Sequence, residues 1–149
     1  MVCGIMGYIC CFSVTDIKHR VPPNCYFEVD DFESNWDFQQ PFDFVHGRGL
    51  IGAMKDPLSV FGQAFQNLKP GGWFEAVDTV PVAHADDDTL QNAPNTVEWC
   101  KLVDQASANF GKRMVIPHLY KQWMTDAGFQ NVEEAVYKVC LLLRYYNPV

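Results

Sequence analysis

The sequence predicts an α/β fold in which helices flank a parallel sheet. Three consecutive features predict it: an amphipathic helix, a tight turn and a buried strand. The helix is expected over residues 57–68, because apolar residues recur there at the spacing of one helical face: Leu58, Phe61, Phe65 and Leu68. The turn is Pro70-Gly71-Gly72, and the strand is expected from Trp73 to about Val82. Helix, turn and strand in this order form half of a parallel α/β unit.

Both ends of this helix carry sequence signals. Asp56 is expected to accept hydrogen bonds from the free N–H groups of the first turn, and Pro57 suits the first helical position. At the other end, Pro70 with Gly71 and Gly72 is expected to stop the helix. The helix boundaries are therefore predicted from local chemistry alone.

Two shorter strands are expected before the helix. Residues 21–24 form a turn, and a strand runs from Tyr26 to Val29. Pro41 precedes a second strand from Phe42 to His46. The apolar segment 1–12 is shorter than the about 20 residues that span a bilayer, and it lacks the basic region of a signal peptide. We expect this segment to form a core strand.

Two further helices are expected after the predicted strand that starts at Trp73. The first carries one apolar face and is capped by Asn95 or Thr96; the face consists of Trp99, Val103, Ala106 and Phe110. The second is closed by Gly128 and carries Ile116, Leu119, Trp123 and Ala127. Two closing strands are expected at residues 132–136 and 139–146. Residues 86–89 form a solvated, helix-capping turn, because Asp86, Asp87 and Asp88 lack the other ligands of a calcium loop.

Composition bounds the class of protein. The 149 residues, of which 48% are hydrophobic, suffice for one ordinary domain over residues 1–149. The net charge of -7 argues against a nucleic-acid surface, which needs clustered Lys and Arg. The six cysteines contain no CxxC pair, so no metal site and no disulfide framework is expected. We expect an intracellular protein, cytoplasmic or nuclear, that binds small molecules or proteins and no membrane.

The order of several short motifs resembles one family. From residue 21 to residue 136 the chain is similar to the LaeA-like S-adenosylmethionine-dependent methyltransferases of fungal secondary metabolism. The similarity lies in segments 27–31, 41–48, 63–65 and 68–73, in Trp36, and in segments 86–90 and 127–129. The resemblance implies an incomplete class I, Rossmann-like methyltransferase fold, with a central, mostly parallel sheet, flanking helices and a β-hairpin-like C-terminal pair of strands. Residues 1–20 form a divergent N-terminal segment, and residues 21–149 form the family-like region.

The resemblance also implies binding residues for S-adenosylmethionine. In such folds the cofactor lies across the carboxyl ends of the parallel strands. Carried over residue by residue, Asp31 accepts a hydrogen bond from the adenine amino group and the Phe32 N–H meets the ring. His46, Gly47 and Arg48 form the wall between cofactor and acceptor. Two of these residues also have an alternative role that stays open at this stage. His46 is either part of this wall or a structural residue, and Arg48 either binds a ligand or pairs with Glu28 or Asp43.

One part of the family pattern is missing from these 149 residues. The family has a glycine-rich loop of the GxGxG type after its first strand and an acidic residue after its second, and neither is supplied here. We expect this absence to orphan the Tyr26 strand and to expose an edge of the Phe42 strand. Segment 1–12 is expected to replace a missing strand, or the open edge pairs with another subunit or a protein partner. The chain is thus expected to be truncated.

Three functions remain open from the sequence. The first is methyl transfer from S-adenosylmethionine to a small-molecule or protein acceptor, for which a complete cofactor cradle is required. The second is a cofactor-independent cyclisation or isomerisation with His46 or His84 as catalytic acid or base. The third is a noncatalytic partner or regulator of full-length relatives. Five aromatic residues either line a substrate cavity or fill the core: Trp73, Trp99, Phe110, Tyr120 and Trp123.

Overall fold

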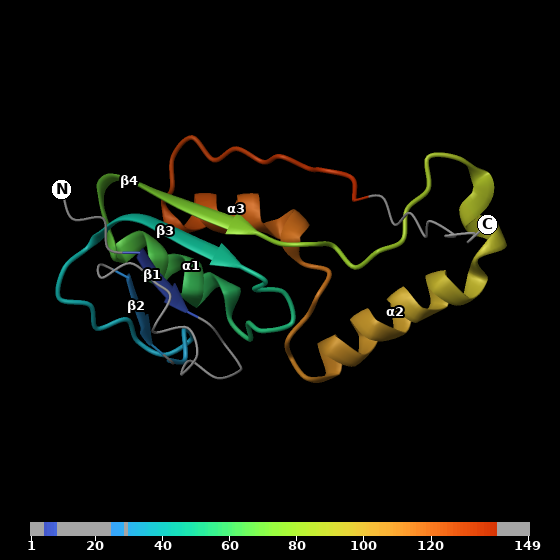
Figure 1. Cartoon of the computed structure of the whole chain (residues 1–149), viewed down its shortest axis with the longest axis horizontal. Coiled ribbons are helices and arrows are strands. Elements are labelled where there is room, and N and C mark those ends of the chain that lie inside the picture. The colour runs from blue at the N-terminus through green and yellow to red at the C-terminus, as the bar shows by residue number, and fades with distance from the viewer. Residues whose placement is uncertain (1–4, 9–24, 29, 140–149) are drawn as a thin grey trace, which may run out of the picture.

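The structure, a computed structural model, describes residues 5–8, 25–28 and 30–139. Strands and helices alternate through the middle of the chain, and two helices follow (Figure 1). The elements are β1 (Ile5–Tyr8), β2 (Cys25–Glu28), β3 (Phe42–Arg48), α1 (Pro57–Gln66), β4 (Leu68–Val77), the 3-10 helix η1 (Asp88–Asn92), α2 (Pro94–Asn109), the 3-10 helix η2 (Pro117–Leu119) and α3 (Tyr120–Ala127). The predicted α/β class is confirmed.

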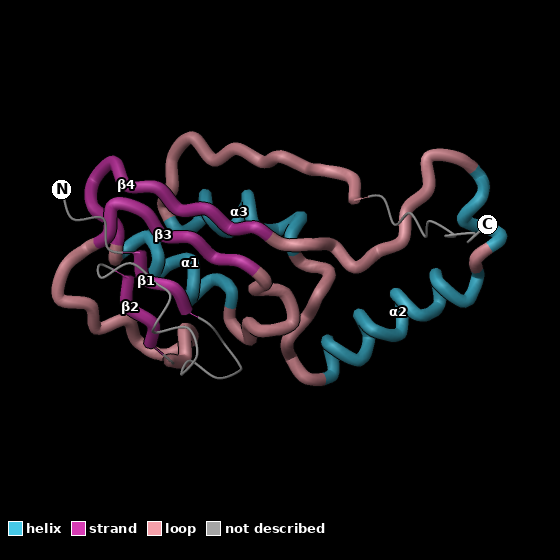
Figure 2. Tube along the Cα trace, viewed as in Figure 1, coloured by secondary structure: helices cyan, strands magenta, loops and turns pink. Residues whose placement is uncertain are grey.

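Within the described residues, the strands form two separate parallel pairs. β1 pairs with β2, and β3 pairs with β4. Figure 2 shows the two pairs as distinct magenta groups. The β3–α1–β4 sequence is a parallel strand–helix–strand unit, so the fold is an incomplete Rossmann-like α/β fold. None of the described helices is long and apolar enough to cross a membrane.

The start of α1 is as predicted, but its end is not. The Asp56 carboxylate accepts the Ser59 N–H at 3.1 Å, and Pro57 occupies the first turn. The helix ends at Gln66, with Asn67 as C-cap, before the predicted stop at Pro70. The Asn67 carbonyl accepts the Phe42 N–H at 2.8 Å, so pairing with β3 begins where the helix ends. Strand pairing, and not the Pro-Gly-Gly turn, therefore ends α1.

β4 begins earlier and ends earlier than predicted. It runs from Leu68 to Val77, and it contains the Pro70-Gly71-Gly72 segment that was expected to precede it. Along β3 the pairing advances from Phe42 to Phe44, while along β4 it advances from Leu68 to Trp73. The extra residues bulge out of the ladder, and Gly71, at φ +80, supplies a backbone conformation that favours glycine. The predicted extension to Val82 is wrong.

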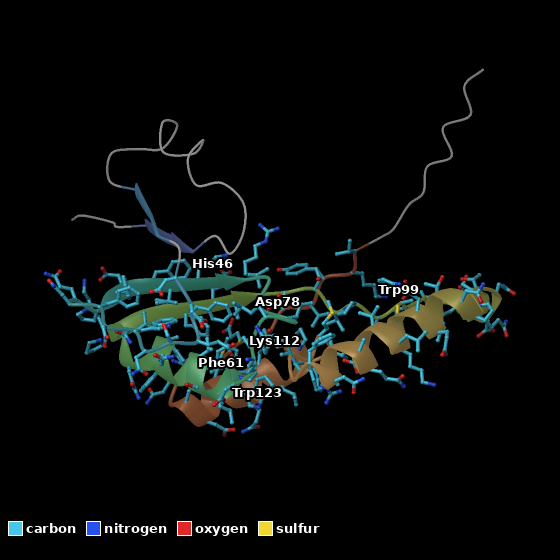
Figure 3. All side chains as sticks on the ribbon, turned by 90° about the horizontal axis from the view of Figure 1, so that it is seen from below. His46, Phe61, Asp78, Trp99, Lys112 and Trp123 are labelled. Carbon is cyan, nitrogen blue, oxygen red and sulfur yellow. The ribbon has the colours of Figure 1, made fainter. Side chains whose placement is uncertain are left out.

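The core lies between α1, α3 and one face of the β3–β4 sheet. Phe61 of α1 is fully buried, and its ring meets Phe74 of β4 at 5.4 Å and Tyr120 of α3 at 5.2 Å, both edge to face. Figure 3 shows Phe61 and Trp123 on the same side of the sheet. The buried cluster consists of Met54, Val60, Phe61, Ile116 and Tyr120. These residues hold the β3–α1–β4 unit and α3 together.

α3 is shorter than predicted, and its C-terminal signal is confirmed. Ile116 and Leu119 belong to the preceding turn and η2, and the helix begins at Tyr120. Gly128 closes it with φ +107, and its N–H donates to the Thr125 carbonyl at 3.0 Å. An added Cβ at Gly128 would lie 3.0 Å from the Phe65 ring. Close packing is therefore a second reason, besides the positive φ, why glycine occupies this position.

α2 departs most from its prediction. Its N-cap is Ala93, followed by Pro94, and no side chain caps the helix, so the predicted caps Asn95 and Thr96 are wrong. Proline fits the first turn because its missing N–H would be unpaired there. No α2 residue is buried, and Trp99 is 61% exposed. The helix extends away from the α1–α3 body in Figure 1.

The two ends of the chain give a mixed result. β1 lies within the apolar segment 1–12 and pairs with β2, as expected for a replacement strand. Residues 132–136 form no strand, so that prediction is wrong. A strand needs a hydrogen-bonded neighbour for its N–H and C=O groups, and no described strand pairs with this segment. The segment predicted at 139–146 lies outside the described residues except for Val139.

Candidate functional site

The candidate site lies at the carboxyl ends of β3 and β4. Ligands of open α/β folds bind at this end of parallel strands. His46, Gly47 and Arg48 are the last three residues of β3, so the strand extends two residues beyond its predicted end at His46. They pair in register with Glu75, Ala76 and Val77 of β4. Because side chains alternate along a strand, His46 and Arg48 share one face and Gly47 points to the other.

His46 forms a close pair with Glu75. The Nδ1 atom of His46 lies 2.8 Å from Oε2 of Glu75, across the ladder from β3 to β4. The two side chains are 42% and 55% exposed. In Figure 3, His46 lies on the side of the sheet opposite Phe61 and Trp123. The structure therefore places His46 on the open face, with an acidic neighbour that no sequence spacing identified.

Asp78, directly after β4, connects the site to the core. Its carboxylate accepts the N–H groups of Leu50 at 3.2 Å and Ile51 at 3.4 Å, and the Tyr120 hydroxyl at 2.8 Å. Tyr120 is 7% exposed. Burial, then the hydrogen bond to Asp78, raises the pKa of Tyr120 well above its ordinary value, so the hydroxyl stays a donor. Asp78 thus holds the loop after β3 against the end of β4.

The loop after β3 contains glycines at the spacing of a dinucleotide-binding loop. Gly47, Gly49 and Gly52 read GxGxxG, and Gly49 and Gly52 have φ values of +69 and +66. In a phosphate-binding loop the backbone N–H groups point at the ligand and a helix opens at once. Here the N–H groups of Leu50 and Ile51 bind Asp78, and α1 starts only at Pro57. The structure therefore does not support a phosphate cradle in this loop.

Asp31 and Phe32 lie in a separate loop, residues 30–38. The Asp31 carboxylate accepts the Glu33 N–H at 3.0 Å, and the Asp31 carbonyl accepts the Ser34 N–H at 2.9 Å. Asp31 and Phe32 line a polar hollow of about 390 Å³, together with Asp30, Ser34, Asn35, Trp36, Asp37 and Phe38. The Phe32 side chain also packs against the core cluster. The hollow has a carboxylate wall beside a partly buried aromatic residue.

Glu33 fastens this loop to the body of the molecule. Its Oε1 atom accepts the N–H of Lys55 at 2.5 Å and that of Asp56 at 3.1 Å, at the entrance to α1. Its Oε2 atom lies 3.9 Å from Nζ of Lys112, in the segment after α2. Asp31 and Phe32 are therefore carried by a loop with fixed anchors.

His84 and the three aspartates form a different surface. Nε2 of His84 lies 3.7 Å from Oδ1 of Asp86, and both side chains are more than 70% exposed. The Asp87 carboxylate accepts the Thr89 N–H and hydroxyl, which lowers the pKa of Asp87 and caps η1 as predicted. Among the described residues, no group of three or more His, Cys, Asp or Glu is placed to hold a metal ion. No contact joins His84 to His46.

The five aromatic residues split between core and surface. Tyr120 and Trp123 pack around Phe61, as expected of core residues. Trp73, Trp99 and Phe110 are 72%, 61% and 80% exposed, so the core expectation is wrong for them. Trp73 is the cross-strand neighbour of Phe44, beside His46 and Glu75. Trp73 is thus the aromatic residue that the structure adds to the candidate site.

Comparison with known proteins decides the family. A methyltransferase domain model matches residues 7–134, which is most of the chain and includes β3, β4 and the loop 30–38. The chain belongs to this methyltransferase domain family. The matched stretch contains His84 and all the residues assigned to the site from the resemblance: Asp31, Phe32, His46, Gly47 and Arg48.

The curated relatives of this methyltransferase domain come from fungi. Methyltransferase pytC of Aspergillus terreus is 30% identical over 118 residues, and methyltransferase cpsF of Aspergillus campestris is 32% identical over 121 residues. The secondary metabolism regulator LAE1 of Cochliobolus heterostrophus is 28% identical over 123 residues. These matches cover 79%, 80% and 80% of this chain, but only 36%, 43% and 40% of the relatives. The resemblance to LaeA-like methyltransferases is confirmed, and the chain spans about two fifths of these relatives' length.

Proposed function

We propose that this chain acts in S-adenosylmethionine-dependent methyl transfer in secondary metabolism, and supplies the adenine-binding loop and the acceptor face of the site. The observation that carries the proposal is the family match over residues 7–134. Relatives named as methyltransferases and as secondary metabolism regulators support the setting. The identity of the methyl acceptor and the groups that complete the site are part of what we propose.

The residues of loop 30–38 fit the adenine end of the cofactor. The hollow beside Asp31 and Phe32 is polar and holds about 390 Å³. The Asp31 carboxylate receives one N–H, from Glu33, so it has acceptor capacity left for an amino group. Asp31 would accept the adenine amino group and the Phe32 N–H would meet the ring. The bound cofactor would supply an electrophilic methyl group on its sulfonium.

The β3–β4 sheet provides the acceptor side of the proposal. His46 lies on the open face at the carboxyl half of β3, where an acceptor has access. Its pairing with Glu75 orients the ring, and an imidazole can act as a general base in catalysis. We assign His46 the role of orienting or deprotonating the acceptor, with Arg48 on the same face. Gly47 faces inward, where an added Cβ would come 2.8 Å from the Leu50 side chain.

We identify no residue among those described that would bind the ribose or the methionine part of the cofactor. The glycine-rich loop of the family is absent from this sequence, and the GxGxxG turn after β3 has its N–H groups bound to Asp78. We propose that a partner chain, or further sequence of a longer protein, completes the cradle. Full affinity and turnover therefore require that complement.

Calorimetric titration of the purified chain with S-adenosylhomocysteine tests the adenine site. We expect weak binding, with a dissociation constant near the millimolar range, about -4 kcal/mol, because only one end of the ligand is held. Asp31→Ala should abolish the heat, whereas Asp126→Ala, an exposed acid on α3 outside the hollow, should leave it unchanged. Absence of heat with the wild-type chain at millimolar ligand would refute cofactor binding by this chain.

A second candidate function is noncatalytic pairing with another chain. It is favoured by the β3–β4 sheet, in which each strand pairs on one side only among the described residues. Unpaired N–H and C=O groups at an edge accept an added strand. Sedimentation velocity over a hundredfold range of concentration would show self-association if the partner is a second copy. A monomer throughout would leave only a different chain as the partner.

A further inference from the structure

The open face of the β3–β4 sheet carries three cross-strand rows in a fixed order. Phe44 pairs with Trp73, His46 pairs with Glu75, and Arg48 pairs with Val77. Successive rows on one face are about 6.6 Å apart, two residues along each strand. From the amino end of the sheet to its carboxyl end, the rows are aromatic, acid–base and cationic. This order determines what kind of molecule could lie along the face.

The middle row fixes the state of the His46 ring. The Glu75 carboxylate can only accept a hydrogen bond, and Nδ1 of His46 lies 2.8 Å from it, so Nδ1 carries the hydrogen. In the neutral ring, Nε2 then has no hydrogen and is the basic atom. Nε2 of His46 is thus available as a proton acceptor on an exposed face.

The first row offers a platform for a flat ring. Trp73 is 72% exposed and Phe44 is 54% exposed. The Phe44 ring centroid lies 6.2 Å from that of His46. Aromatic rings stack with an offset or meet edge to face at centroid separations of 4.5–7 Å. A six-membered ring placed over this row would lie beside the His46 row.

The third row supplies positive charge. Arg48 forms no ion pair with any side chain of residues 30–139, and the Asp43 carboxylate considered as its partner binds Lys69 at 2.8 Å instead. A guanidinium beyond the histidine attracts an oxygen that gains negative charge when it loses a proton. The face therefore complements an aromatic ring at one end and an anion at the other.

We propose that His46 and Glu75 form an acid–base pair that deprotonates the phenolic hydroxyl of an aromatic acceptor lying over Phe44 and Trp73. The proton moves from the phenol oxygen to Nε2 of His46, which leaves a phenolate and an imidazolium, and the imidazolium returns the proton to water. Glu75 is a positioning residue, because it acts through His46. The inference rests on the proposed methyl transfer for its purpose, since a phenolate is the nucleophile that such a transfer needs.

The test uses 7-hydroxycoumarin and the full chain without cofactor. The phenol and phenolate forms of this probe absorb at different wavelengths, so one titration at pH 7 reports binding and ionisation together. We expect the bound probe to contain more phenolate than the free probe. His46→Gln should weaken phenolate binding about tenfold, the size of one lost charge-assisted hydrogen bond. Glu75→Gln should weaken it less than His46→Gln does, because Nε2 remains present.

Two controls separate this role from a structural one. Lys69→Met breaks the other cross-strand ion pair of the same sheet, also 2.8 Å long, and should leave binding unchanged. The 15N shifts of His46 should show hydrogen on Nδ1 in the wild type and a shift toward Nε2–H in Glu75→Gln. Loss of sheet stability alone would move neither the probe's phenolate fraction nor the tautomer.

The outcomes distinguish this inference from the proposed function. Equal binding of 7-methoxycoumarin, no gain of phenolate, or no effect of His46→Gln would overturn the acid–base pair. The titration contains no S-adenosyl compound, so phenolate binding in a chain that gives no heat with S-adenosylhomocysteine would overturn cofactor binding alone. Phenolate binding that His46→Gln weakens and Lys69→Met spares would establish the pair.

Discussion

The two faces of the β3–β4 sheet have opposite environments, although side chains of the same two strands form both. On the inner face, Phe74 and Ala76 of β4 pack against the core beneath α1 and α3. On the outer face, Trp73 and Phe44 are mostly exposed, and His46 and Glu75 lie between aromatic and cationic neighbours. Parallel sheets are usually covered on both faces. One face therefore holds the fold together, while the other leaves large side chains exposed.

This comparison separates residues that stabilise the protein from residues that bind. An apolar side chain contributes to stability in proportion to the area it removes from water. Phe61 removes all of its area, whereas Trp73 leaves 72% exposed. Size and hydrophobicity alone would rank Trp73 as the more important core residue. Its position on the outer face reverses that order.

The largest expected effect comes from the inner face. Phe61→Ala should lower the free energy of unfolding by about 3–5 kcal/mol, because it leaves a cavity between Phe74 and Tyr120. Trp73→Ala, on the outer face, should cost less than about 1 kcal/mol. Urea unfolding followed by circular dichroism measures both. Phe61→Leu leaves a smaller cavity and keeps the comparison measurable if Phe61→Ala does not fold. Equal losses at the two positions would contradict the difference between the faces.

A smaller effect is expected at the junction of core and site. Tyr120→Phe should cost about 1–2 kcal/mol at pH 7, because it removes a buried donor to Asp78. The pKa of Tyr120 is raised in the folded protein, so its contribution is complete below the ordinary value of about 10 and is lost as pH rises above it. Unfolding midpoints at pH 7, 9 and 11 measure this. The wild type and the variant should converge at the highest pH, and a gap independent of pH would refute the assignment.

The smallest effect on stability is expected on the outer face itself. Glu75→Gln should change the free energy of unfolding by less than about 0.5 kcal/mol, because exposed ion pairs contribute little. The same variant should weaken phenolate binding, which would show that the pair serves binding and not the fold. Thermal unfolding beside the coumarin titration measures the two effects. A large loss of stability in Glu75→Gln would assign the pair to the fold instead.

Local signals predicted the elements where one residue decides the backbone. The Asp56 cap with Pro57 and the left-handed Gly128 were both readable, because each acts within one helical turn. The signals failed where pairing decides. α1 ends at Gln66 because the Asn67 carbonyl joins β3, and residues 132–136 form no strand because no described strand pairs with them.

The residues of the candidate site likewise divide into those that the sequence identified and those that only the structure revealed. His46 and Arg48 were identified by motif, and the structure places them on one face of β3. Glu75 was not identified, and Trp73 was named only as a residue of either a cavity or the core. The bulge after Leu68 sets the register that brings them opposite His46 and Phe44. Asp78 joins a loop 28 positions earlier in the chain, and no spacing rule links it to Leu50. Sequence patterns have periods of two or 3.6 residues, and these contacts exceed both.

The sequence by itself determined the α/β class, the starts and ends set by caps, and membership in the methyltransferase family, because these depend on local chemistry and on motif order. Only the tertiary structure decided which face of the β3–β4 sheet is open and which acid accompanies His46. It also showed that the glycine turn after β3 is held by Asp78. Strand register and packing are contacts between distant segments, so they exist only once the chain has folded.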